Sequence, residues 1–350
     1  MAGRDSNRRE FLAAGGGGLL LCTLGGQKIY SDQEADVAAL TSDLEVPPKV
    51  AAASAPGARA EGTTMLAAAK ATRREFWIKA EETKWNAIPR KRDAMTAKKV
   101  KTKGRFTAYG YRGYTAGFQQ PLASKPTIPG PVIDCTVGDT VVVNFRNETP
   151  TPVTIHPHGI QYSSDMDGAY KGKYTDPGGF VQPGETFQYV WEAIPGTEGT
   201  WIYHDHGPLD PVPLYKGLFG PMIVRPAGAP KADREFWAFL HSFQPVATGL
   251  DAPLYCINGK SYAGNTPTFR AKVGETVTWH VVAIDDDFHT FHIHGHRWQE
   301  PDGTIVDNRT LGPGDSFSLT YVEDNPGRWF YHCHVFTHLH QGMNGWYLVE

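Results

Sequence analysis

The stretch VGDTVVVNF (137–145) decides the fold, because it returns as VGETVTWHV (273–281). Both copies combine a Gly-containing turn with the β-branched and aromatic residues of a strand. Four further pairs of blocks repeat in the same order: HPHG (156–159) and HIHG (292–295), QPGETFQYVW (182–191) and GPGDSFSLTY (312–321), TWIYHDH (200–206) and RWFYHCH (328–334), GLFGPMIV (217–224) and GMNGWYLV (342–349). Five matched blocks in one order indicate two homologous domains in tandem.

The region from about residue 105 onward alternates short β-branched and aromatic runs with Gly and Pro, which predicts an all-β sandwich or barrel. A length of 350 residues is enough for two medium domains. We expect Greek-key β domains at 105–228 and 229–350, divided at the Pro- and Gly-rich stretch 226–230. Residues 27–104 are expected to form a linker and then a basic, partly helical arm (65–103), whose aromatic side chains pack on the body or whose charges form a docking surface.

The N-terminus has the pattern of an export signal. The sequence Asn7-Arg8-Arg9-Glu10-Phe11-Leu12 precedes a Gly-, Ala- and Leu-rich run, as in twin-arginine signals, so we assign residues 1–26 to one. The run is too short and too rich in glycine for a membrane span, so we expect no stable membrane insertion. The export signal itself predicts a periplasmic or extracellular protein. The formal net charge of −3 predicts no attraction to nucleic acid.

The sequence contains four cysteines. Cys22 falls in the predicted signal and Cys333 in the last histidine-rich block. Cys135 and Cys256 either form a disulfide in an oxidising compartment or remain two separate buried thiols.

Histidines recur in pairs separated by one residue. Because successive side chains of a strand point to opposite faces, the two histidines of an HxH pair share one face and form a pincer for a metal ion. Four pairs at equivalent positions of a repeat predict metal sites rather than structural histidines: His156/His158, His204/His206, His292/His294 and His332/His334.

Cys333 stands between His332 and His334, so the same rule turns its thiol to the opposite face. One backbone segment therefore joins two different metal sites. A thiolate with two imidazoles and a weak thioether is the ligand set of a blue-copper site, and we assign it to Cys333, His289, His338 and, as the axial ligand, Met343. A structural zinc site would not explain the four pairs, and iron more often recruits a carboxylate.

Together, HPHG, YHDH, HTFHIHGH and HCHVFTHLHQGM resemble the motifs of the multicopper oxidases, and specifically of the small two-domain laccases, over residues 105–350. The resemblance implies two cupredoxin domains and about four copper ions per chain: one type 1 ion and a cluster of one type 2 and two type 3 ions that reduces O2 to water. By match to the family motifs, the ligands of type 2 copper would be His156 and His292, and those of the type 3 pair His158, His204, His206, His294, His332 and His334.

The first domain departs from the pattern of a type 1 site. Asp205 stands at the position of Cys333 and Val153 at that of His289, so only the second domain is expected to hold type 1 copper. Each domain then supplies half of the cluster ligands. The resemblance implies a homotrimer with the clusters between subunits, and assembly within one chain is the alternative.

Four residues are predicted to take part in the reaction. Cys333 passes electrons to the cluster, and His338 presents the imidazole edge that faces the electron donor. Asp167 is expected to deliver protons and Tyr162 to be transiently oxidised, although a turn-forming Asp and a core Tyr explain both equally well. Residues Asp285–Asp287 either attract cationic donors or form a solvated loop.

The function expected from the resemblance is that of a laccase, which oxidises phenols or aromatic amines by one electron and reduces O2 to water. The alternative is a metallo-oxidase acting on Cu(I), Fe(II) or Mn(II). A copper nitrite reductase would need a blue-copper cysteine in the first domain and fewer HxH pairs. A simple electron carrier would leave the eight histidines of the pairs unexplained.

Overall fold

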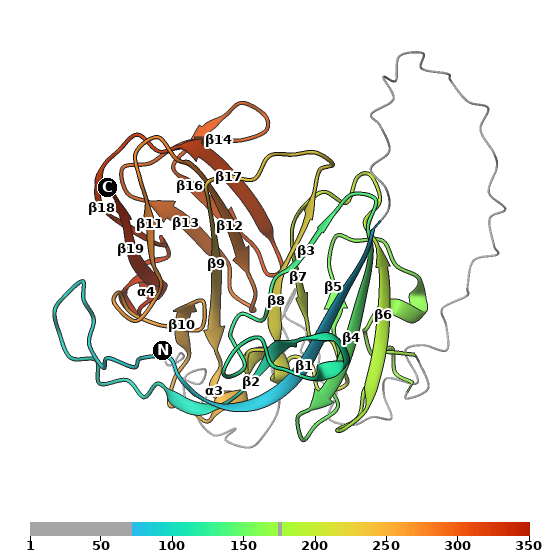
Figure 1. Ribbon diagram of the computed structural model, residues 1–350. Coiled ribbons are helices and arrows are strands. Elements are labelled where there is room, and N and C mark those ends of the chain that lie inside the picture. The colour runs from blue at the N-terminus through green and yellow to red at the C-terminus, as the bar shows by residue number, and fades with distance from the viewer. Residues whose placement is uncertain (1–71, 174–176) are drawn as a thin grey trace, which may run out of the picture. The chain divides into compact units, whose positions relative to one another are not determined.

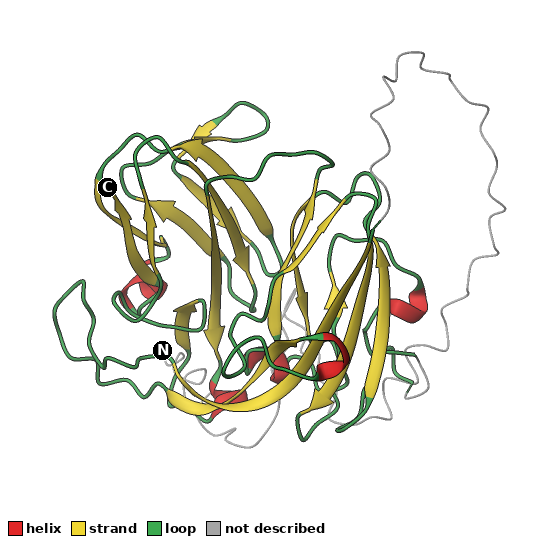
Figure 2. Cartoon of the chain, in the orientation of Figure 1, coloured by secondary structure: helices red, strands yellow, loops and turns green. Residues whose placement is uncertain are grey.

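The computed structural model describes residues 72–173 and 177–350 (Figure 1), so the predicted export signal and linker lie outside the described residues. The described part consists mainly of strands joined by loops, with a few short helices (Figure 2). None of its helices is long and apolar enough to cross a membrane. The helical elements are η2 (Ala116–Phe118), η3 (Ser164–Met166), α2 (Val212–Tyr215), α3 (Pro245–Thr248) and α4 (Phe336–His340).

The first domain packs two four-stranded sheets on each other. One sheet has the order β2-β1-β4-β6 and the other β3-β8-β7-β5. Side chains from both sheets, among them Val141, Tyr189 and Tyr203, form one buried cluster. The strands are β1 (Arg73–Asn86), β2 (Arg105–Tyr114), β3 (Ile133–Thr136), β4 (Thr140–Glu148), β5 (His156–Pro157), β6 (Thr186–Glu192), β7 (Gly199–His204) and β8 (Phe219–Arg225).

The second domain repeats this plan. Its sheets have the orders β10-β9-β12-β17 and β11-β19-β18-β13-β16, with a separate hairpin β14-β15. Trp279, Phe291 and Tyr347 centre the core between them. The strands are β9 (Arg234–Phe243), β10 (Leu254–Ile257), β11 (Thr268–Ala271), β12 (Thr276–Ala283), β13 (His289–Ile293), β14 (Trp298–Gln299), β15 (Ile305–Val306), β16 (Asn308–Leu311), β17 (Ser316–Val322), β18 (Gly327–Cys333) and β19 (Asn344–Val349).

The sequence repeat is also a repeat of strand pairing. The block 137–145 leads into β4, which pairs parallel with β1 and antiparallel with β6. The block 273–281 leads into β12, which pairs parallel with β9 and antiparallel with β17. Two tandem cupredoxin-like β-sandwiches are therefore confirmed. The predicted boundary at 228/229 lies between β8 and β9 and stays a prediction.

The helix predicted in the basic arm is wrong over residues 73–86. These residues form β1, which pairs with β2 and β4 inside the first sandwich. Alternation explains the strand, because Ile78 and Ala80 are buried in the core whereas Lys79 and Glu81 between and beside them are not. The sequence also carried a sixth repeat that we missed: REFW occurs at 74–77, in β1, and at 234–237, in β9.

Cys135 and Cys256 are both buried and free, so of the two alternatives the structure has separate thiols. Cys256 belongs to a third buried cluster, which joins residues of the first domain, such as Trp85 and Phe219, to residues of the second, such as Phe239 and Phe243. The two sandwiches are thus joined by a buried apolar interface.

His280 of β12 forms a polar contact between the two domains. Its Nδ1 lies 2.7 Å from the hydroxyl of Thr200 in β7 and 3.0 Å from that of Ser318 in β17. Its ring stacks on Trp237 with centroids 4.4 Å apart, and its Nε2 is buried without a partner among the described residues. The imidazole is therefore held as a neutral ring.

We expect His280 to make stability depend on acid. Burial, assisted by the charge of Arg225, lowers the pKa of His280 from 6.5 to about 4. The carboxylates of Glu235 and Asp134 oppose this change only in part. Between these values the unfolded chain binds the proton that the folded chain refuses, so stability is complete above pH 6.5 and falls towards pH 4, by about 3 kcal/mol. The measurement is the free energy of unfolding in denaturant at pH 6.5 and at pH 4, for the metal-free wild type and for His280→Gln. The loss of stability between the two pH values should be smaller in the variant by that amount.

The exposed His340 supplies the control for this measurement. His340→Gln should keep the pH dependence of the wild type. An equal slope in wild type and His280→Gln would show that the interdomain imidazole contributes nothing.

Candidate metal centres

The end of β18, the start of β13 and helix α4 bring together Cys333, His289 and His338. Cys333 Sγ lies 3.8 Å from Nδ1 of His289 and 3.6 Å from Nδ1 of His338, and the two Nδ1 atoms are 3.3 Å apart. All three side chains are buried. One point lies about 2 Å from all three atoms, which is the usual length of a metal bond to imidazole nitrogen or thiolate sulfur. The trio can hold one metal ion without rearrangement.

The backbone around the trio fixes the thiol. The N–H of Cys333 donates to the carbonyl oxygen of Met343 (3.1 Å), and the N–H of Thr290 donates to Cys333 Sγ (3.4 Å). Met343 is fully buried in the same core cluster as Cys333. Its predicted role as axial ligand is compatible with this place and stays a prediction.

Electrostatics favours the thiolate form of Cys333. Burial alone raises the pKa of the thiol, but hydrogen bonds with His289 and His338 outweigh it and lower the pKa to about 6. For His289, burial lowers the pKa, but the hydrogen bonds of the ring to Asp285 and Cys333 outweigh burial and raise the pKa to about 9. A thiolate is the form of cysteine that binds metals.

Asp285 positions His289 from the far side of the ring. Its Oδ1 lies 3.0 Å from Nε2 of His289, and neither side chain is exposed. Since a carboxylate only accepts, Nε2 donates a proton to Asp285, and Nδ1 is the nitrogen that faces the trio. The prediction of a solvated loop is therefore wrong for Asp285, whose carboxylate lies inside the protein.

Asp285→Asn should weaken metal retention by the trio. Loss of a carboxylate that orients a ligating histidine typically costs about 10- to 100-fold in affinity. The measurement is copper content after dialysis against a graded series of chelator concentrations. Asp286→Asn is the matched control, because Asp286 bonds to Tyr215 instead; equal copper loss from both variants would contradict the role of Asp285.

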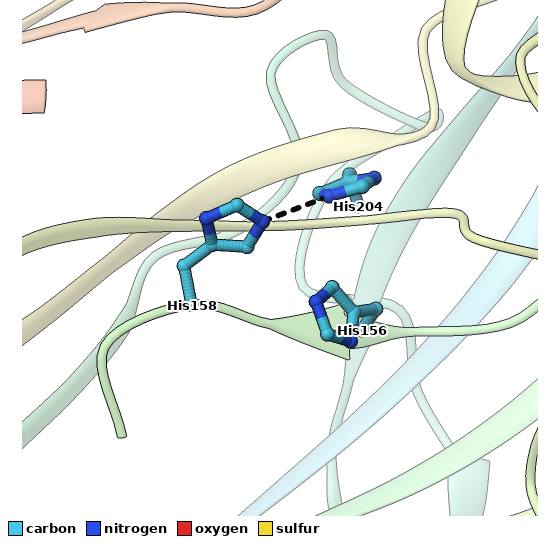
Figure 3. Close-up of side chains that lie close together, drawn as sticks. All are labelled: His156, His158 and His204. Carbon is cyan, nitrogen blue, oxygen red and sulfur yellow. Dashed lines mark hydrogen bonds between the residues drawn. The ribbon is translucent and has the colours of Figure 1, made fainter. Parts of the chain in front are cut away.

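Three histidines of the first domain converge at the ends of β5 and β7. His156, His158 and His204 point toward one another (Figure 3), and Nε2 of His158 lies 3.0 Å from Nε2 of His204. Nδ1 of His204 and Nδ1 of His156 lie 2.7 Å from the backbone carbonyl oxygens of Asp205 and Asp167. Each therefore keeps its proton on Nδ1 and leaves Nε2 free for a metal. The ring of His206 lies beside them, 5.3 Å from that of His156.

The second domain repeats this set with His292, His294 and His332. Nε2 of His294 lies 3.1 Å from Nε2 of His332. Nδ1 of His292 lies 2.6 Å from the carbonyl oxygen of Asp307, and Nδ1 of His332 lies 2.9 Å from that of Cys333. The ring of His334 lies 5.6 Å from that of His292. The strand rule holds, because Cys333 faces His289 and His338 while its neighbours face this set.

The two histidine sets do not meet within residues 72–173 and 177–350. No described imidazole of one set makes a ring contact or a hydrogen bond with the other set, and each set groups only with its own members. The first set borders a cavity that Asp286 and Gly314 of the second domain also line. With His206 beside the first set and His334 beside the second, each domain offers four of the eight expected cluster ligands.

The predicted residues Asp167 and Tyr162 lie beside the first set. Oδ1 of Asp167 is 3.1 Å from Nδ1 of His156, and Oδ2 forms an ion pair of 2.7 Å with Lys171. Tyr162 lies 6.1 Å from His156 between ring centroids and bonds to Asp167. The contacts give Asp167 a part in orienting His156; proton delivery and oxidation of Tyr162 stay predictions.

Sequence reasoning missed two supports of the sites. Tyr255 stacks on His338 with centroids 4.0 Å apart and donates to Oδ2 of Asp287 (3.1 Å). Glu323, only 1% exposed, bonds to His296, whose Nδ1 in turn lies 2.8 Å from the carbonyl oxygen of His294. No local motif marks Tyr255 of β10 or Glu323, which follows β17, since both are distant in sequence from their partners.

The donor sets fit copper. The trio combines a thiolate with two imidazoles, which suits copper. In each of the other sets, two histidines bond to backbone carbonyl oxygens through Nδ1 and leave Nε2 available. Cys333 and His332 are neighbours in the chain, so the trio and the second histidine set share one strand.

Comparisons with known proteins identify the family of the chain. Two family models, both described as multicopper oxidase, match residues 114–229 and 233–350. A probable nitrite reductase-hydroxylamine oxidoreductase fusion protein of Kuenenia stuttgartiensis is 34% identical over 64% of the chain, and the mouse ferroxidase HEPHL1 is 27% identical over 81%. The chain spans only 28% and 30% of these two curated relatives. A crystal structure of a multicopper oxidase superposes with a TM-score of 0.64 at 26% identity, covering 79% of this chain and 89% of that one.

Proposed function

The chain belongs to the multicopper oxidase family, whose members are copper-dependent oxidoreductases, and from this premise we propose that it oxidises phenols or aromatic amines and reduces O2 to water. The observation that carries the proposal is the arrangement at the end of β18. Cys333 faces His289 and His338, while His332 faces a histidine set on the other side of the strand. A carrier protein would need the first arrangement alone.

The protein groups divide the work between the two sides of β18. Bound copper would supply one-electron redox chemistry and, as a cluster, a store of the four electrons that O2 requires. Cys333 connects the two sides, because its backbone is bonded directly to His332 and His334. Backbone carbonyl oxygens fix the tautomers of His156, His204, His292 and His332.

The electron donor is expected to approach His338. Tyr255 covers one face of the imidazole, and the carboxylate of Asp287, 44% exposed, lies 3.9 Å from Nε2 of His338. This carboxylate is placed to accept a hydrogen bond from the hydroxyl of a phenol. Small aromatic donors therefore fit the approach to the imidazole.

We further propose that the two histidine sets meet between subunits. Since the described chain keeps them apart, a head-to-tail contact can join the first set of one copy to the second set of the next. Closure after three copies gives the homotrimer that the motifs imply, with about four copper ions per chain. Export to the periplasm or exterior, through residues 1–26, belongs to the same proposal.

Oxidation of metal ions is the second candidate. The carboxylate of Asp287 beside His338 also suits a Cu(I), Fe(II) or Mn(II) donor, and one relative is named a ferroxidase. Asp287→Asn should then lower kcat/KM for Fe(II) by about tenfold, as loss of one nearby charge does. A phenol oxidase should lose less with a neutral phenol.

Nitrite reduction is not proposed, although the Kuenenia relative carries that name. The position in the first domain that would need a cysteine holds Asp205, which is fully buried and accepts the N–H of Thr154 (2.7 Å). The first domain therefore lacks the thiolate for a copper of this type.

Oxygen uptake by the copper-loaded protein tests the proposal. With 2,6-dimethoxyphenol as donor, we expect one O2 consumed per four electrons and a higher kcat/KM than with Fe(II) or Cu(I). A strong preference for a metal ion would replace the first candidate by the second. Full copper loading without oxygen uptake would reduce the chain to a carrier.

A further inference from the structure

The connection between β1 and β2 carries an unusual concentration of positive charge. Residues 90–105, here called the basic loop (teal in Figure 1), contain eight Lys and Arg side chains and one acid, Asp93. Asp93 is turned inward, where it accepts the N–H of Met95 (2.9 Å) and the hydroxyl of Thr96 (2.7 Å). Of the eight cations, only Lys103 forms an ion pair with a described residue, the exposed Asp251.

The cations line a groove rather than scattering over the surface. Five of them, with Asn86 and Thr102, surround a hollow of about 440 Å³ that Ile88 and Val100 help to line. The five are Lys91, Lys99, Lys101, Lys103 and Arg105. A groove with apolar contacts among several cations is suited to an anionic partner that spans more than one charge.

The basic loop is fixed on the second domain. The N–H of Arg90 donates to the side chain of Asn265 (2.8 Å), whose amide donates to the carbonyl of Arg92 (3.0 Å). The N–H of Ala94 donates to the carbonyl of Ala263 (2.8 Å). The loop is thus held by backbone groups before any partner arrives, which lowers the cost of ordering it on binding.

The segment that anchors the basic loop, residues 262–265, also bonds to the chain on both sides of Met343. The N–H of Tyr262 donates to the carbonyl of Gly342 (2.7 Å), and the N–H of Ala263 donates to the side chain of Asn344 (2.9 Å). These two residues flank Met343, and α4 with His338 immediately precedes them. The basic loop is therefore two hydrogen-bonded steps from the residues that receive electrons in the proposed function.

We propose that the basic loop docks an acidic electron-carrier protein that delivers electrons to the Cys333 trio. The proposal rests on the proposed oxidase function. Eight cations are more than one small donor can engage, and their hydrogen-bonded connection to the residues around Met343 suits a donor. Complexes between redox proteins are small and transient, and charge complementarity sets their rate of encounter.

The probe for this surface is reduced cytochrome c, native and with its lysines succinylated, because the two forms share a haem and differ in the sign of their charge. The copper-loaded protein should bind and oxidise the succinylated form faster than the native form, with rates that fall as salt is added. Lys99→Glu/Lys101→Glu should weaken binding and slow oxidation by about tenfold. Lys231→Glu/Lys272→Glu is the control of equal charge on other exposed residues and should change both by less than about twofold.

The arms of the experiment separate the possible failures. Wild type that consumes oxygen with 2,6-dimethoxyphenol but treats both cytochromes alike would overturn the docking proposal and leave the oxidase function. Absence of turnover with the phenol would refute the oxidase function. Binding of the succinylated cytochrome, measured by interferometry, would still show whether the basic loop docks an acidic protein. Tighter binding of alginate than of the acidic cytochrome, lost in Lys99→Glu/Lys101→Glu, would replace the protein partner by an acidic polysaccharide.

Discussion

Replacing Cys333 by serine is expected to abolish oxidation of every donor, by about three orders of magnitude or more in kcat. The hydroxyl stays protonated where the thiol, with its pKa lowered to about 6, is a thiolate. The trio then loses its thiolate, through which residue 333 would connect bound copper to His332 and His334. Steady-state oxygen uptake and the visible absorption of the copper-loaded variant check the result.

A second buried cysteine provides the matched control. Cys135 is free and 1% exposed, and its Sγ contacts the carbonyl of Ile223 rather than any imidazole. Cys135→Ser should cost about 1–3 kcal/mol of stability and keep the colour and the activity. Equal loss of activity in both variants would mean that the effect of Cys333→Ser is one of folding.

Mixing two inactive variants should restore activity. His156→Ala/His158→Ala lacks the first histidine set, and His292→Ala/His294→Ala lacks the second, so neither should reduce O2 alone. In a head-to-tail ring of randomly mixed subunits, about one contact in four joins an intact first set to an intact second set. Coexpression of the two variants should therefore recover about a quarter of wild-type oxygen uptake per chain.

The control is a mixture in which both variants are damaged in the first set. Coexpressed His156→Ala and His204→Ala offer no intact first set to any neighbour, and activity should stay absent. Absence of recovery in the first mixture as well would refute the cluster between subunits and favour assembly within one chain.

The sequence was sufficient for the architecture and for the grouping of the histidines with one another and of Cys333 with His289 and His338. The repeat predicted two β domains, because equivalent strands of the two domains keep the same turns and the same alternation of buried and exposed residues. The parity of a strand then separated Cys333 from His332 and His334 without any knowledge of the fold. These inferences depend only on residues close together in the chain.

What remained unpredicted depends on contacts between distant segments. Asp285 reads as part of an acidic surface run, yet β12 and β13 bring it under His289 with no exposed surface. Tyr255 reaches His338 from another sheet. In β1, the density of charged residues concealed a half-buried strand, because only Ile78, Ala80 and Trp85 of its fourteen residues are buried.

The proposed meeting of the two histidine sets between subunits would make copper binding depend on protein concentration. Where a cluster needs two copies of the chain, metal binding and association strengthen each other by the same free energy. Copper occupancy should then rise with protein concentration, and chelators should act as dissociating agents. A chain released singly into a large volume would bind copper through the Cys333 trio first and fill its clusters only on meeting its neighbours.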